Sequence, residues 1–149
     1  MNTHPFLRAF LAGTFVPTLI LPLLLVAFIV IRLVMKVQVP IERGLIFPMA
    51  VVPALWGLWN MLYLGWHERT HLAVGPHGAI LPLLLAPLGA IVATSLGILH
   101  LGATGFTWFQ ACQVPYGFLA FGLCIGVAVY YLVWKYIVGY LNHVLGIAA

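Results

Sequence analysis

Four long apolar segments constrain this chain more than any other feature. They extend over residues 9–31, 44–66, 79–101 and 116–141, and each holds 23 to 26 residues. A helix of about 20 residues crosses the hydrocarbon core of a bilayer. Lipid offers no partner to an unpaired backbone amide, which favours helices over strands. We therefore predict an all-α integral membrane protein, a single domain built as a bundle of four transmembrane helices.

The shortage of charge supports this prediction. Hydrophobic residues make up 64% of the 149 residues, and only eight residues are Lys, Arg, Asp or Glu. Soluble domains are about a quarter charged, so a soluble fold is excluded. The six basic residues are scattered near the segment ends rather than clustered, which argues against nucleic-acid binding. The partners we expect are the lipid bilayer and other membrane subunits, or a second copy of this chain.

Basic residues also predict an orientation. The connection after the first segment carries the densest group, Arg32, Lys36 and Arg43. Because basic loops stay in the cytoplasm, we place this connection there and both termini outside, in a bacterial-type inner membrane.

Paired prolines and regularly spaced small residues predict how the helices bend and pack. The pairs Pro17/Pro22, Pro48/Pro53 and Pro82/Pro87 remove backbone donors, so several helices are expected to be kinked. Small residues that recur every four positions allow two helices to approach closely, within the chain or with a partner. These predicted packing positions are Gly89, Ala93, Gly97, Gly122 and Gly126.

One short string carries a chemical hypothesis. His67-Glu68-Arg69-Thr70-His71 has the form H-E-x-x-H, in which two histidines one helical turn apart bind zinc. This geometry requires the second helix to continue to His71. Four spans place His77 and His143 on the same side of the membrane, so either could supply a third ligand. The same histidines could instead hold a haem through two axial ligands.

The string resembles the zincin metallopeptidase signature over these five residues. The resemblance implies that His67 and His71 bind zinc and that Glu68 is the general base. The chain departs from that family because no downstream carboxylate is present to complete the ligand set.

A polar and aromatic stripe leads towards the histidines. Trp56, Asn60 and Tyr63 follow steps of three and four, which places them on one helical face. In a transporter or channel, this stripe would line a cavity.

Three functions are consistent with these patterns. The first expectation is a non-catalytic accessory or scaffolding subunit of a larger membrane complex, which packs through its small residues. The second is a zinc- or haem-binding membrane protein, with an H-E-x-x-H metalloenzyme as one form. The third is a small transporter or channel for an uncharged or hydrophobic substrate.

Overall fold

The computed structural model describes residues 4–34, 36, 46–108 and 112–147, except for the side chains of Ile46, Phe47 and Glu68. The chain is mostly helical, as predicted. Its helices are α1 (Pro5–Val34), α3 (Ile46–Thr70), α4 (Val74–Ser95) and α5 (Tyr116–Val133). A π-helical segment, η1 (Trp134–Val138), and α6 (Gly139–Val144) continue α5 without a break.

Three of the described helices are long and apolar enough to cross a membrane. They are α1, α4 and the continuous helix Tyr116–Val144. The remaining long helix, α3, has 25 residues, which corresponds to about 37 Å at 1.5 Å per residue. It is less apolar, since it carries Asn60 in its middle and the polar string His67–Thr70 at its end. The expectation of four long helices is confirmed.

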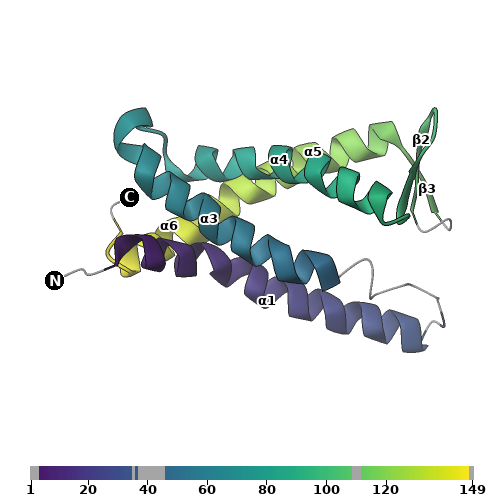
Figure 1. Cartoon of the computed structure of the whole chain (residues 1–149), viewed down its shortest axis with the longest axis horizontal. Coiled ribbons are helices and arrows are strands. Elements are labelled where there is room, and N and C mark those ends of the chain that lie inside the picture. Colours follow the sequence, from purple (N-terminus) through teal and green to yellow (C-terminus); the bar gives the residue numbers. More distant parts are fainter. Residues whose placement is uncertain (1–3, 35, 37–45, 109–111, 148–149) are drawn as a thin grey trace.

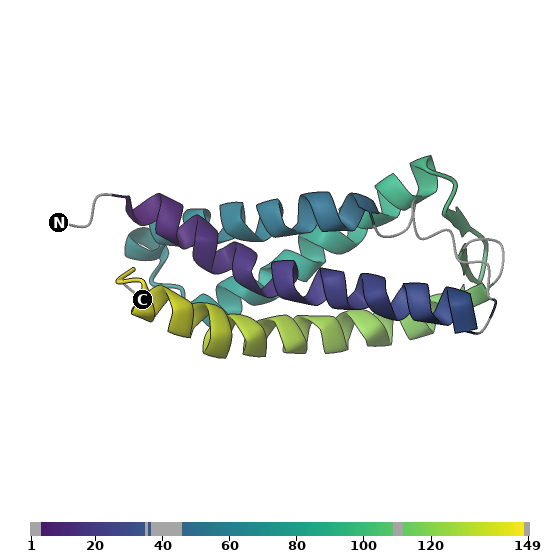
Figure 2. The ribbon, with the colours of Figure 1, turned by 90° about the horizontal axis from the view of Figure 1, so that it is seen from below.

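The helices form two pairs that cross (Figure 1). In one pair α1 packs along α3, and in the other α4 packs along α5. The pairs meet near the chain termini and lie further apart at the opposite end, where a small sheet joins α4 to α5. Figure 2 shows that the described ends of α1 and α6 lie at the same end of the bundle. The connection between α3 and α4 also lies there.

The third helix begins earlier than predicted. The third segment was expected to begin at residue 79, yet α4 already begins at Val74, which leaves residues 71–73 as the connection from α3. Pro76 fits in the first turn because the amides there have no intrahelical acceptor. Gly75 and Gly78 instead allow α4 to pack closely against side chains of the last helical segment.

The third segment also ends earlier than predicted, at Ser95 instead of residue 101. Gly97 has a left-handed φ of 68°. The amide of Ile98 donates to the carbonyl of Ala93 and that of Gly97 to the carbonyl of Thr94. This is the Schellman pattern that terminates helices at glycine. Gly97 therefore ends α4, and the stripe of predicted packing positions stops at Ala93.

A three-stranded antiparallel sheet joins the last two helical segments, where no strand was predicted. Its strands are β1 (Leu99–Leu101), β2 (Gly105–Trp108) and β3 (Cys112–Pro115), with β2 in the centre. The hydroxyl of Tyr116 donates to the carbonyl of Gly102 at 2.7 Å, which ties the sheet to the start of α5. The sheet thus caps the end of the α4–α5 pair.

Two glycine contacts bring the helices close together. A Cβ on Gly13 of α1 would lie 3.0 Å from the Cα of Gly57 in α3, so these backbones touch. At Gly78 of α4, a Cβ would overlap the indole of Trp134. The first contact holds the α1–α3 pair together, and the second holds α4 against η1.

Replacing Gly78 by Val should destabilise the protein. The new side chain would displace Trp134, and overpacking of this kind costs about 1–3 kcal/mol. Gly126→Val is the matched control, because a Cβ on Gly126 meets nothing within 4 Å. Thermal unfolding in mild detergent, followed by tryptophan fluorescence, should show a lower midpoint for Gly78→Val alone. Equal midpoints in the two variants would contradict the packing role of Gly78.

Candidate functional site

The helix that carries the H-E-x-x-H string ends before its second histidine. The helix ends at Thr70, and His71 has a φ of 49°. This left-handed conformation turns its Cβ away from the direction that a helical residue would have. Nδ1 of His67 instead donates to the carbonyl of Leu72 at 3.2 Å. His67 and His71 therefore do not project from one helical face, contrary to the requirement set out above.

The other histidines do not complete a ligand set. His77 is buried, and His143 is exposed in α6. Nε2 of His77 donates to the carbonyl of Trp59 at 3.0 Å, and Nε1 of Trp59 donates back to the carbonyl of His77 at 3.0 Å. Among the described residues, no group of three or more His, Cys, Asp or Glu could hold a metal ion. The side chain of Glu68 lies outside the described part, so the structure does not place the predicted base.

The stripe from Trp56 to Tyr63 lies on one face, as predicted, but its side chains are packed against other helices. Trp56, Asn60 and Tyr63 are 4%, 0% and 2% exposed. The indole of Trp56 lies between the rings of Tyr130 and Trp134, at centroid distances of 4.9 and 5.5 Å. None of the three residues lines either hollow described below.

An amide pair forms the centre of this packed region. Nδ2 of Asn60 donates to Oδ1 of Asn142 at 2.8 Å and to the carbonyl of Ala9 at 2.7 Å. Nδ2 of Asn142 donates back to Oδ1 of Asn60 at 3.1 Å. Both asparagines are fully buried, so the pair joins α1, α3 and α6 by hydrogen bonds that water does not reach.

The π-helical turn explains how Asn142 reaches this position. Trp134, Val138 and Asn142 are all fully buried and are spaced by four residues. In an α-helix, four residues overshoot one turn by about 40°. The wider turn of η1 takes up part of this overshoot. Trp134 and Asn142 thus both face the other helices.

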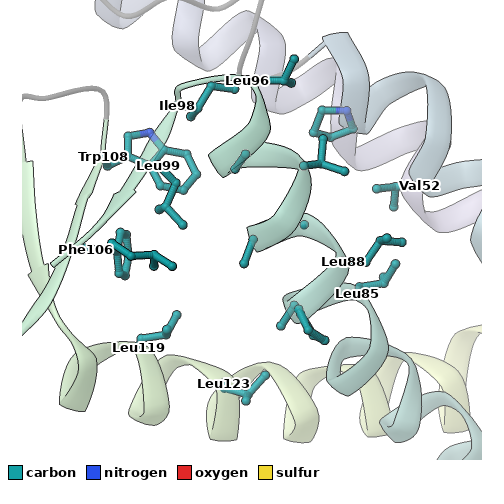
Figure 3. Close-up of a pocket in the computed structure, with 18 of the residues that line it drawn as sticks. Val52, Leu85, Leu88, Leu96, Ile98, Leu99, Phe106, Trp108, Leu119 and Leu123 are labelled. Carbon is teal, nitrogen blue, oxygen red and sulfur yellow. The ribbon is translucent and has the colours of Figure 1, made fainter. Parts of the chain in front are cut away.

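A lateral cavity of about 580 Å³ lies where the two helix pairs diverge. Figure 3 shows Leu99 and Phe106 extending from the sheet and Leu119 from α5 towards a space beside α4, with Val52 of α3 on the far side of α4. None of its described lining residues is Asp, Glu, Lys, Arg or His. The cavity therefore offers apolar contacts and no charge.

A second hollow, the side groove, lies next to the lateral cavity and has a volume of about 540 Å³. Its lining includes Cys112 and Val114 of β3 and Phe118 and Gly122 of α5. Four residues line both hollows and form a ridge between them. The ridge residues are Phe106, Trp108, Leu119 and Leu123.

Several predicted packing residues line these hollows. Gly89 and Ala93 line the lateral cavity, and Gly122 lines the side groove. A Cβ on Gly89, Gly122 or Gly126 meets nothing within 4 Å. Within the chain these small residues leave space, and contact with a partner helix stays a prediction.

Sequence reasoning missed the ridge residues and the sheet that carries two of them. The only available signal was the alternation of Phe106, Thr107 and Trp108, which is typical of a strand with one apolar face.

Comparisons with known proteins identify no relative. No protein-family model, curated protein or solved structure matches the chain.

The asparagine pair should show energetic coupling. Replacing either Asn60 or Asn142 by Ala leaves a buried amide without its partner, which costs about 1–3 kcal/mol. The double variant should lose less stability than the sum of the single losses, because the second substitution removes the unpaired group. Unfolding of the four proteins in mild detergent measures this difference. Gln113→Ala removes an exposed amide and serves as control; additive losses would contradict the coupling.

Proposed function

We propose that this chain is an integral membrane protein that binds an uncharged, apolar ligand in its lateral cavity. Three helices with the length and apolarity of spans support insertion. The fourth, α3, buries Asn60 against Asn142, so its most polar side chain inside the span would not meet lipid.

The observation that most directly supports this proposal is the composition of the cavity lining. Its described lining comes from α3, α4, α5 and the sheet, and it is almost wholly aliphatic and aromatic. A volume of about 580 Å³ lies within the range of about 300–1,000 Å³ that is typical of small-molecule sites. A charged or strongly polar ligand would lose its hydration there without new hydrogen bonds, which is unfavourable. An apolar molecule dissolved in the bilayer has no hydration to lose and needs no hydrogen bonds in the cavity.

The cavity is consistent with the transporter alternative only in part. It accounts for a hydrophobic substrate, but it is lined by residues other than the stripe that was expected to form a path. Binding is therefore the function that the geometry supports, and movement of the ligand across the membrane is not required by it.

One observation favours the accessory-subunit role as a second candidate. None of the eighteen residues of α5 is buried, all of them are described, and Gly126 leaves open space on this helix. A helix from another membrane protein could approach closely there. Cross-linking in the membrane from position 126 would detect such a partner. If no cross-link to another protein forms, α5 faces lipid.

Filling the cavity should weaken ligand binding. In Gly89→Leu a branched side chain enters the lateral cavity from α4, where nothing lies within 4 Å of the new Cβ. We expect an affinity for the uncharged, apolar fluorophore diphenylhexatriene at least tenfold lower, corresponding to about 1.4 kcal/mol. Gly126→Leu, which adds the same side chain outside both hollows, should bind normally. Equal binding by all three proteins, or no binding by the wild type, would contradict the proposal.

Cysteine labelling tests insertion and orientation together. Cys112 and Cys124 are exposed thiols, but Cys112 lines the side groove and Cys124 lies eight residues into α5, about 12 Å from its start. Hydrocarbon prevents formation of the reactive thiolate, so in a Cys112→Ser background a membrane-impermeant maleimide should spare Cys124 and label Gln113→Cys, since Gln113 is exposed. If the termini are outside, position 113 is cytoplasmic and should react only after cells are permeabilised. Rapid labelling of Cys124 in Cys112→Ser would contradict insertion of α5, and labelling of Gln113→Cys in intact cells would reverse the orientation.

A further inference from the structure

We infer that the apolar group bound in the lateral cavity is one acyl chain of a two-chain lipid that straddles the ridge, with its other acyl chain in the side groove. This inference rests on the proposed function and specifies the class of ligand.

The first support is the arrangement of the two hollows. Their volumes, about 580 and 540 Å³, are nearly equal. Both are lined by the ridge residues, of which the rings of Phe106 and Trp108 lie 6.4 Å apart in an edge-to-face arrangement. Two similar chains joined at one end could therefore occupy both sides of one wall. A rigid ring system of comparable size could fill one hollow only.

The second support is the division of the sheet into two faces. Residues opposite each other in adjacent strands share a face, and successive residues alternate. The register therefore places His100, Thr107 and Gln113 together on one face. The other face is apolar, and every residue of it lines one of the two hollows. These residues are Leu99, Leu101, Phe106, Trp108, Cys112 and Val114.

The two faces indicate where each part of the lipid lies. The apolar face forms a floor for both chains. The polar row of His100, Thr107 and Gln113 is directed away from them, and all three strands lie at one end of the bundle (Figure 1). An amphipathic sheet at the end of a bundle matches the boundary between hydrocarbon and headgroups. A lipid whose chains extend from this end along α4 and α5 keeps its headgroup at the boundary.

The hollows suit the chains of a lipid and not its headgroup. Neither hollow has a Lys, Arg, Asp or Glu among its described lining residues. The two chains therefore meet no charge, and the headgroup stays at the boundary; we take the zwitterionic diacyl phospholipid phosphatidylethanolamine as the probe of this class. The surrounding bilayer supplies such a molecule at high local concentration.

Native mass spectrometry of the full chain in mild detergent tests this inference with two probes, dioleoyl phosphatidylethanolamine and its one-chain lyso form. Joining two chains makes the second binding event intramolecular, which raises affinity by tenfold or more. Wild-type protein should bind one two-chain lipid per chain, at least tenfold tighter than the lyso lipid. Gly122→Leu fills the side groove and should remove this advantage while binding of the lyso lipid is retained. Gly126→Leu, one turn further along α5, should behave as wild type.

The outcomes separate the two proposals. If Gly89→Leu loses both lipids but Gly122→Leu retains the two-chain preference, or if wild-type protein never shows that preference, the two-chain inference is wrong and the proposed function stands. If folded wild-type protein binds neither lipid nor diphenylhexatriene, the proposed function itself fails. If Gly89→Leu turns a dimer into a monomer without any loss of lipid, a second copy occupies the cavity and the lipid assignment is overturned.

Discussion

The hydrogen bonds of Asn60 determine much of this architecture. Its amide bonds to Asn142 of α6 and to the backbone of α1, so three helices meet at one buried side chain. Nearby, Trp134 packs over Gly78 and brings in α4. All these contacts lie on the side of the bundle nearest the termini. Two helix pairs that are joined on one side and cross at an angle must separate on the other, and this separation creates the lateral cavity. The apolar hollow is thus a consequence of a polar contact elsewhere in the bundle.

The helices could be predicted because length and apolarity are properties of whole segments. The ends of the helices could not be predicted, because they depend on single residues that can either end a helix or pack inside one. Gly75 and Gly78 are typical of a turn, but here they accommodate Tyr131 and Trp134 inside a helix, which only the partner helix reveals. His71 was expected to continue α3 and instead adopts a left-handed conformation at its end. The zinc hypothesis depended on that one residue.

The candidate site was less predictable than the fold. A small residue in a helix permits either close contact or empty space, and the sequence alone does not distinguish them. Gly13 and Gly57 provide contact, whereas Gly89 and Gly122 border hollows. The stripe through Trp56 and Asn60 was correctly assigned to one face. This face is packed because Trp56 contacts Tyr130 and Trp134, which lie more than seventy residues further along the chain. Such distant pairings leave no local signal.

The divergence of the two helix pairs has a mechanical consequence. The two helix pairs lie close together where they cross and further apart towards the sheet (Figure 1). If the chain spans a bilayer as we propose, it would occupy unequal areas in the two leaflets. Inserted in a flat membrane, such a taper imposes curvature stress on the surrounding lipid. If lipid fills the open end as we propose, it would relieve part of this stress, and occupancy of the cavity would be coupled to local bending of the membrane through the shape of the protein.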